Sequence, residues 1–170
     1  MKLSEDLITP RLRIRSHRAG DKAFVLSMWG DLENGKYMSD PAAENMDEKY
    51  LACIDGMEDE PDGYYMTAEL RENGAPVGTC CAFPEGGNYD IGYCISKDHW
   101  KEGLGTEMLA ALIEWIKQQG GRSVTGEVAD QNAASVALLS KFGFCPDRKT
   151  RYKKWGEETY FDAHYYRLDL

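Results

Sequence analysis

The segment Trp100-Lys101-Glu102-Gly103-Leu104-Gly105-Thr106 lies between a predicted strand and a long predicted helix. Two glycines in G-x-G spacing let the backbone approach a ligand closely. The free N–H groups of the first helical turn, with the helix dipole, form an anion site that suits a diphosphate, and Lys101 adds a positive charge nearby. Taken alone, G-x-G fits a plain strand-to-helix turn better. The G-x-G-x-x-G dinucleotide motif and the Walker loop are both absent.

The chain downstream of this segment alternates helices and strands. Residues 106–119 carry an apolar stripe that predicts an amphipathic helix, and Gly120-Gly121 ends it. A strand over residues 123–129, a helix over 133–142 and a closing hairpin of 148–155 with 160–169 follow. This order is typical of an α/β protein.

The chain upstream of the segment is richer in strands. Period-two alternation predicts a strand over residues 7–15, and Asp21 and Gly30 are placed to cap and end a short helix between them. A second helix carries Tyr50, Leu51 and Ile54. Strands are predicted over residues 64–71, 76–83 and 89–96, with Asn73-Gly74 joining the first two and Gly86-Gly87-Asn88 turning the chain into the third.

Size and composition favour one globular domain. The chain has 170 residues, of which 42% are hydrophobic, and no run approaches the ~18 to 20 apolar residues that cross a bilayer. The N-terminal residues 1–15 alternate charged and apolar side chains where a signal peptide needs an apolar run, so we expect a soluble, cytoplasmic protein that binds no membrane. A net charge of −9 argues against nucleic acid and favours a cationic partner, although simple solubility explains it as well.

Cysteine and histidine spacing argues against a metal site or a disulfide framework. The five cysteines are odd in number and lack C-x-x-C spacing, and no two of the three histidines are spaced as paired ligands on a helix. We therefore expect reduced, mostly buried cysteines and no metal.

Two further motifs extend the pattern around the central segment, and together they resemble the GNAT superfamily of N-acetyltransferases. The similarity is strongest to the branch related to enzymes that acetylate the N-termini of ribosomal proteins. The residues that carry it are Ile91-Gly92-Tyr93-Cys94-Ile95, Trp100 to Glu107, Asn132 with Ser135, Phe142-Gly143-Phe144, and the opening Thr9-Pro10-Arg11-Leu12-Arg13-Ile14-Arg15. The resemblance covers nearly the whole chain. It implies the GNAT acyl-CoA N-acyltransferase fold, α/β (α+β), with a mixed central sheet of about six to seven strands and about four helices.

The resemblance also implies where acetyl-CoA binds, in a wedge between the strands of residues 89–96 and 123–129. The backbone of Cys94, Ile95 and Ser96 would pair with the pantetheine arm, and one N–H there would polarise the acetyl carbonyl. The diphosphate would lie on Lys101, Glu102, Gly103, Leu104, Gly105 and Thr106, beside Trp100. Asn132 would reach the pantetheine amides and Ser135 would lie near the sulfur, although a helix cap and an exposed helix residue are their alternative roles.

The predicted reaction is direct attack of a primary amine on acetyl-CoA in a ternary complex. Removing the proton of a lysine-type amine at pH 7 costs roughly 4 to 5 kcal/mol, whereas an α-amine costs about 1 kcal/mol. Asp90 and Glu127 are the candidate general bases, and Ser135 or Tyr152 could protonate the leaving thiolate. A route through an acyl-cysteine at Cys94 or Cys145 lacks an evident activating histidine.

The acceptor itself is not encoded in a recognisable motif. Residues 17–83 would build its wall, and the acidic loop 58–62 with Glu44, Asp47 and Glu48 would attract a cation. Polyamines, aminoglycosides, lysine side chains and protein N-termini all remain open, with a slight preference for N-termini. A non-catalytic acyl-CoA sensor and a purely structural protein are the competing hypotheses, and an exposed strand edge near the C-terminus could form a homodimer.

Overall fold

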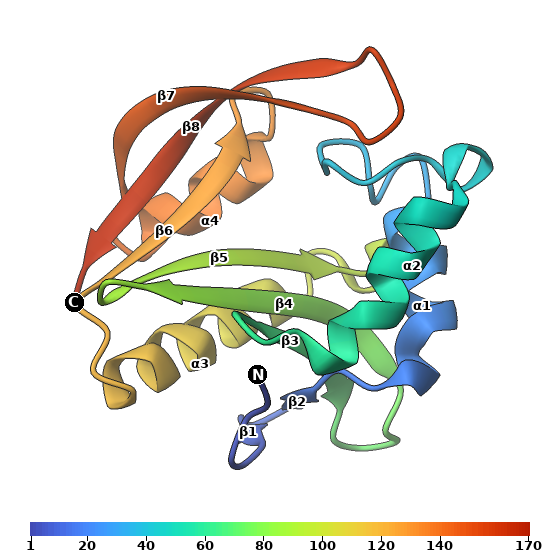
Figure 1. The fold of residues 1–170 in the computed structure, drawn as a ribbon. Coiled ribbons are helices and arrows are strands. Elements are labelled where there is room, and N and C mark those ends of the chain that lie inside the picture. Colours follow the sequence, from blue (N-terminus) through green and yellow to red (C-terminus); the bar gives the residue numbers. More distant parts are fainter.

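The computed structural model describes all 170 residues and contains one eight-stranded sheet, flanked by four α-helices (Figure 1). The strand order is β1-β2-β3-β4-β5-β6-β8-β7. The strands are β1 (Leu7–Ile8), β2 (Leu12–Ser16), β3 (Tyr64–Leu70), β4 (Pro76–Glu85), β5 (Asn88–Ile95), β6 (Ser123–Ala129), β7 (Cys145–Lys153) and β8 (Tyr160–Asp169). The helices are α1 (Lys22–Trp29), α2 (Glu48–Gly56), α3 (Leu104–Gln118) and α4 (Ala133–Lys141), with four short 3-10 turns between elements.

All neighbouring strands are antiparallel except β5 and β6, which are parallel. These two strands pair at three positions only, from Asn88 with Ser123 to Asp90 with Thr125. Residues 91–95 of β5 and 126–129 of β6 then diverge, as Figure 1 shows. We call this divergence the fork. It leaves one edge of β5 without a strand partner in the second half of that strand.

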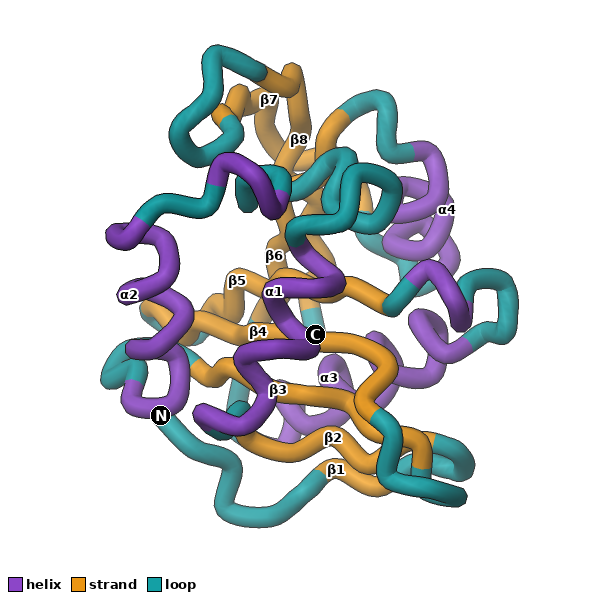
Figure 2. The backbone as a smooth tube through the Cα atoms, turned by 90° about the vertical axis from the view of Figure 1, so that its right-hand side faces the viewer, coloured by secondary structure: helices purple, strands orange, loops and turns teal.

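The helices cover the two faces of the sheet. α3 and α4 pack on one face, where Met108, Leu112 and Leu139 join the main core. α1 and α2 lie on the opposite face of β3 and β4 and form a smaller cluster with Tyr65 (Figure 2). Because side chains alternate along a strand, Asp90, Gly92 and Cys94 of β5 face away from α3. None of the helices has the length and apolar character that crossing a membrane requires.

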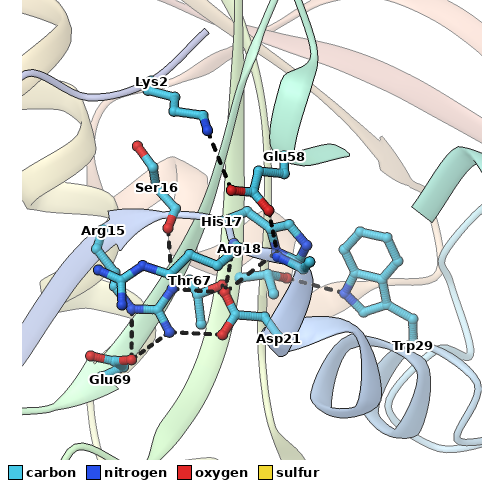
Figure 3. A network of polar contacts seen from close by, with 12 residues as sticks. Lys2, Arg15, Ser16, His17, Arg18, Asp21, Trp29, Glu58, Thr67 and Glu69 are labelled. Atoms are coloured by element: carbon cyan, nitrogen blue, oxygen red, sulfur yellow. Dashed lines mark hydrogen bonds and ion pairs between the residues drawn. The ribbon is translucent and has the colours of Figure 1, made fainter. Parts of the chain in front are cut away.

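A buried ion pair anchors α1 to the sheet (Figure 3). The guanidinium of Arg15 donates two 2.7 Å hydrogen bonds to Asp21, and both residues are nearly inaccessible to solvent. Asp21 also accepts from the backbone amide of Arg18 and the hydroxyl of Thr67. Asp21 occupies the predicted N-cap position of α1, but its side chain does not cap the helix, because its carboxylate makes these contacts and no capping bond to α1.

The fold agrees with the predicted α/β organisation. The sheet has eight strands where about six to seven were predicted, and the additional strand has a local cause. The predicted strand over residues 7–15 is divided into β1 and β2, because Pro10 cannot donate to a ladder and Thr9 turns the chain by bonding to Leu12. α3 begins at Leu104, two residues before its predicted start. The turns at Gly74, Gly86 and Gly87 all have positive φ, as glycine-directed hairpins require.

Candidate active site

The backbone of β5 presents alternate residues to the fork. The amide of Ser96 donates to the carbonyl of Val77 on β4, so Ser96 and, by alternation, Cys94 direct their backbone groups toward β4. Ile91, Tyr93 and Ile95 therefore direct theirs toward the fork. Of the three residues predicted to pair with pantetheine, only Ile95 has this orientation. Which residues of β5 direct their backbone groups toward the fork depends on long-range strand pairing, so it was not readable from the sequence.

The outer end of β5 is held by two side chains that converge on one carbonyl. Trp100 Nε1 donates to the Ile95 oxygen at 2.8 Å, and Asn34 Nδ2 approaches the same oxygen at 3.3 Å. Asn34 also accepts from the amide of Lys97 and donates to Cys94 Sγ. Asn34 comes from the segment after α1, so a residue that sequence reasoning missed fixes the end of the predicted cofactor strand.

The N-terminus of α3 has the features of an anion site. Gly103 is the N-cap, with φ +81°, and no side chain caps the helix there. Lys101 also has positive φ, at +66°, and residues 101–103 are exposed. The first-turn amides of α3 are consequently available to a bound anion, as the G-x-G pattern predicts.

Arg11 adds a positive charge to this loop. Its Nη1 donates to the Glu102 carbonyl at 2.8 Å, and its Nε donates to Glu107 at 2.7 Å. Burial opposes ionisation of Glu107, but hydrogen bonds from Thr9 and Arg11 outweigh it and lower the pKa of that carboxyl. A Cβ built on Gly103 would lie 3.5 Å from Arg11 Nη2. Arg11 therefore neutralises the acidic residue of the first turn and borders the anion site.

The start of α4 faces the fork from the side of α3. Asn132 caps the helix by accepting from the amide of Ser135 at 3.2 Å, so its capping role is present and its amide nitrogen stays free. The hydroxyl of Tyr93 is buried without a hydrogen-bond partner. Burial raises its pKa to about 12, and the nearby hydroxyl of Ser135 acts in the opposite direction. This orphaned hydroxyl between β5 and α4 marks a place where a polar ligand group would fit.

The two candidate bases lie on the opposite face, near the closed end of the fork. Asp90 accepts a 2.8 Å hydrogen bond from Thr125 on β6. Burial raises the pKa of Asp90, the bond from Thr125 opposes this, and the charge of Glu127 adds to the rise. Asp90 and Glu127 thus lie on one face, close enough to influence each other.

Tyr152 belongs to a bridge across the open end of the fork. Its hydroxyl donates to the backbone carbonyl of Tyr37, in the segment between α1 and α2. Lys154 Nζ donates to the carbonyls of Gly35 and Asp40, each at 2.8 Å, and the Trp155 amide donates to Ser39. We call residues 152–155 and 35–40 together the bridge. Burial raises the pKa of Tyr152 to about 12, so the phenol stays protonated.

The acidic residues predicted to attract the acceptor mostly have structural partners. Glu58 bonds to Lys2 and the amide of Ala19, and Asp47 caps α2 and accepts from Trp155. The bridge also contains Asp40, a carboxylate that sequence reasoning missed. Its position depends on the bridge, and no local motif marks it.

The cysteines of the site, Cys81 and Cys94, are partly buried thiols. Burial, and then the charge of Asp40, raise the pKa of Cys94 to about 12, and Cys81 is raised to about 12 mainly by burial. Cys145 and Cys53 are exposed, and all five cysteines are free. A thiol that stays protonated is a poor nucleophile, so Cys94 does not suit an acyl-enzyme.

These features together match a known domain. The family model described as "Acetyltransferase (GNAT) domain" matches residues 11–145. The chain belongs to the GNAT acetyltransferases. It is an acyltransferase, with the fold and family that the motifs from Ile91 to Phe144 indicate.

One relative and two solved structures are examples of proteins that this GNAT chain is similar to. The uncharacterised N-acetyltransferase p20 of Bacillus licheniformis is 25% identical over 146 residues, covering 82% of each chain. A candidate ribosomal-protein-serine acetyltransferase from Vibrio cholerae has a similar structure, with TM-score 0.74, 16% identity and 100% of both chains covered. Spermidine N-acetyltransferase from Vibrio cholerae, solved with CoA and spermine, aligns with TM-score 0.78 and 13% identity over 95% of this chain and 96% of that one.

The residues of this GNAT chain fit the acetyl-CoA that the family uses. An uncapped helix N-terminus bordered by Arg11 suits the diphosphate, and the free backbone edge of β5 suits the amides of pantetheine. No three His, Cys, Asp or Glu side chains lie together as a metal ion would need.

Proposed function

We propose that this GNAT protein transfers the acetyl group of acetyl-CoA to a cationic primary amine by direct attack in a ternary complex. The observation that carries the proposal is the fork: β5 and β6 separate after Asp90 and Thr125, and the free edge of β5 leads to the uncapped N-terminus of α3. A ligand with an anionic end and a chain of amides matches both features. The bound thioester would supply the electrophilic carbonyl.

We propose three groups of residues for the cofactor. The first-turn amides of α3, with Lys101, Gly103 and Arg11, would hold the diphosphate. The backbone of Tyr93 and Ile95, replacing the predicted set of Cys94, Ile95 and Ser96, would pair with pantetheine. The free amide nitrogen of Asn132 and the hydroxyl of Ser135 would complete the slot from α4.

The chemistry on the acceptor side would use the carboxylates of the opposite face. Asp90 and Glu127 are the bases proposed from the sequence, and the raised pKa of Asp90 suits proton uptake. For the leaving thiolate we favour Ser135 over Tyr152, because the hydroxyl of Tyr152 already donates to Tyr37. The raised pKa of Cys94 supports direct attack over an acyl-cysteine.

The acceptor is proposed to be an alkylamine or a protein or peptide N-terminus that enters as an ammonium ion. Carboxylates at both ends of the fork, Asp40 and Asp90, and the net charge of −9 support a cationic acceptor. The family likeness alone does not choose between these amines.

The first experiment is thermal denaturation with and without acetyl-CoA, followed by free-thiol release against an amine panel. The panel contains n-butylamine, spermidine, alaninamide and Nα-acetyl-lysinamide. We expect an upward shift of the melting temperature with acetyl-CoA, and thiol release that depends on at least one amine. A shift without any amine response would support the alternative of a non-catalytic acyl-CoA sensor. No shift at saturating acetyl-CoA would refute both.

We also propose that two copies of the chain can form a homodimer through the C-terminal edge of the sheet. β7 is the edge strand of the sheet, and most of its side chains are exposed. A two-fold antiparallel pairing would bring its basic residues Arg148, Lys149 and Arg151 close to their copies, so it needs anions or high salt. Sedimentation at two salt concentrations distinguishes such a dimer from a monomer.

A further inference from the structure

Asp40 is a carboxylate that forms no salt bridge with a cation of the protein. Its Oδ1 accepts a 2.8 Å hydrogen bond from the hydroxyl of Tyr50, and no other side chain donates to its carboxylate. Lys154 lies close, but its Nζ donates to the backbone carbonyls of Asp40 and Gly35 and not to the carboxylate. The side chain is half-buried, so the free oxygen combines a negative charge with a partly desolvated position.

Asp40 faces the same side of the sheet as the candidate bases. Its negative charge adds to burial in raising the pKa of the thiols of Cys94 on β5 and Cys81 on β4, which places it near both. Cys81 pairs with Gly92 in the ladder, between Asp90 and Cys94 on the same face. A Cβ on Gly92 would approach Cys81 Sγ to 2.9 Å, so the thiol of Cys81 occupies the space beside this glycine. Asp40 therefore lies near the middle and outer part of β5, and Asp90 lies where β5 still pairs with β6.

The bridge holds Asp40 over the fork. Tyr152 donates to Tyr37, Trp155 donates to Ser39, and Lys154 donates to Asp40 itself. Figure 1 shows the tip of the β7–β8 hairpin next to the segment between α1 and α2. Since Tyr50 is 4% exposed and anchored in the α2 cluster, its hydroxyl fixes the rotamer of Asp40 from the other side.

The phenols and thiols around Asp40 stay protonated at neutral pH, so the carboxyl of Asp40 is the acid among these groups that ionises. Burial raises the pKa of the phenols of Tyr50 on α2 and Tyr65 on β3, so both stay protonated. Burial lowers the pKa of Lys154, whose ammonium faces Asp40 from the hairpin. The thiols of Cys81 and Cys94 are also protonated.

We propose that Asp40 binds the ammonium group of the acceptor and accepts its proton, with Tyr50 as its positioning residue. This inference rests on the proposed function and deepens it. One proton moves from the ammonium nitrogen to Asp40 Oδ2, and the resulting amine forms a C–N bond with the acetyl carbon. The C–S bond breaks, and the leaving thiolate takes the second amine proton. The products are the N-acetyl amide, CoA thiol and protonated Asp40, which then loses its proton to solvent.

Burial supports this role energetically. It raises the pKa of Asp40, which the bond from Tyr50 and the charge of Lys154 only partly oppose, and this reduces the difference from the pKa of the ammonium. Asp90 would then be a second carboxylate at the closed end of the fork. The hydrogen bond that it accepts from Thr125 restrains its position there.

The test compares Asp40→Asn with the unmodified protein on n-butylamine and alaninamide. We expect kcat/KM for n-butylamine at pH 7 to fall about 100-fold, the lower end of what general bases contribute. The loss should shrink as pH rises, because free amine then forms in solution. It should be smaller for alaninamide at pH 7, because α-amines have a pKa near 7.7 to 8.0 and are already partly deprotonated. A purely structural defect would not depend on amine pKa.

A second measurement does not require turnover. Calorimetric titration of n-butylamine into the protein with bound CoA should show weaker amine binding for Asp40→Asn, with CoA affinity unchanged. Tyr50→Phe should weaken both kcat/KM and amine binding less, by about tenfold, because it removes one hydrogen bond to a charged group. It also provides a second variant should Asp40→Asn fold poorly.

Glu72→Gln is the matched control, because Glu72 is an exposed carboxylate of the β3–β4 turn without a hydrogen-bond partner and lies outside the proposed site. It should leave all values unchanged. Unmodified kcat/KM and pH dependence in Asp40→Asn would overturn the role of Asp40 and leave the proposed function intact. Absence of amine-dependent thiol release in the unmodified protein, despite acetyl-CoA binding, would overturn the proposed function itself.

Discussion

The indole N–H of Trp100 donates a 2.8 Å hydrogen bond to the carbonyl oxygen of Ile95. This bond joins the start of the proposed diphosphate loop to the end of the proposed pantetheine strand. Its removal should loosen both at once, so Trp100→Phe tests whether the two segments act as one CoA site. We expect CoA affinity to fall about fivefold to tenfold, corresponding to about 1 kcal/mol for one partly exposed hydrogen bond.

Trp155→Phe is the control for this variant. Trp155 is similarly exposed and its indole N–H also donates, to Asp47 at 3.2 Å, but it lies on the bridge. Its CoA affinity, measured by calorimetry, should equal that of the unmodified protein. Equal losses in both variants would contradict a specific role for Trp100.

Gly103→Ala should weaken CoA binding at the N-terminus of α3. The residue has φ +81°, so a side chain costs about 1 kcal/mol in backbone strain and adds a methyl group at the anion site. Gly74 has φ +74° in an open hairpin, and Gly74→Ala carries the same strain far from the loop. We expect similar losses of melting temperature in both variants and a CoA affinity loss of about tenfold in Gly103→Ala alone. Equal CoA affinities would show that the loop does not contact the ligand.

The ion pair of Arg15 and Asp21 should control stability in acid. Burial alone would raise the pKa of Asp21, but the bonds from Arg15, Arg18 and Thr67 lower it from 3.8 to about 2. A carboxyl whose folded-state pKa is depressed stabilises the fold above its unfolded pKa, and this contribution disappears as pH falls from 3.8 toward 2. Its size is about 2 kcal/mol.

Asp21→Ala leaves the buried guanidinium of Arg15 with Glu69 as its remaining charged partner. We expect a loss of about 3 kcal/mol or more at pH 7, measured by urea denaturation. Asp6→Ala breaks the more exposed pair of Asp6 with Arg13 and should cost less than about 1 kcal/mol. A similar cost in the two variants would argue against the buried pair as an anchor.

His17 should make stability fall at mildly acidic pH. Burial lowers its pKa from 6.5 despite the nearby charge of Asp21, and Nδ1 lies 3.7 Å from an oxygen of Asp21 without a hydrogen bond (Figure 3). A histidine with a depressed folded-state pKa favours folding above pH 6.5, and this stability is lost as pH falls below 6.5. The free energy of unfolding should therefore decline below pH 6.5, and His17→Gln should remove that decline between pH 6.5 and 5. An unchanged slope in the variant would assign the effect elsewhere.

Thiol reactivity should separate the cysteines into two classes. Cys53 and Cys145 are exposed, whereas burial raises the pKa of Cys80, Cys81 and Cys94. Iodoacetamide at pH 8 should alkylate two cysteines in the native protein and all five in urea, as mass spectrometry would count. The double variant Cys94→Ala/Cys145→Ala should retain most acetyl transfer. Complete loss with intact CoA binding would revive an acyl-cysteine route.

The parts of the molecule that follow local rules were predictable from the sequence. The stripe of α3, its start at a G-x-G loop and the glycine hairpins depend on residues within a few positions of one another. The division of the first strand at Pro10 was missed because apolar residues that suit a strand lie on both sides of it. The capping role given to Asp21 failed because a partner distant in sequence, Thr67, and the guanidinium of Arg15 compete for the same carboxylate.

The site was predictable only where one segment supplies it. Arg11, Asn34 and Asp40 make contacts with residues that are 91, 60 and 114 positions away in the sequence. No local spacing pattern indicates contacts over such separations. The direction of the Ser96 backbone amide toward Val77 is likewise a result of the pairing between β5 and β4. Acidic residues such as Glu58 and Asp47 looked available because their structural partners were not visible in the sequence.

The fork also has a mechanical consequence. The sheet consists of a five-stranded block and a three-stranded block that share three residue pairs, and beyond those pairs the bridge connects the two blocks. The angle between the blocks should therefore be the softest motion of the molecule, and amide exchange should be fastest along the free edge of β5 and in the bridge. A ligand that spans the fork supplies the missing cross-links, so its affinity and the stiffness of the sheet are coupled.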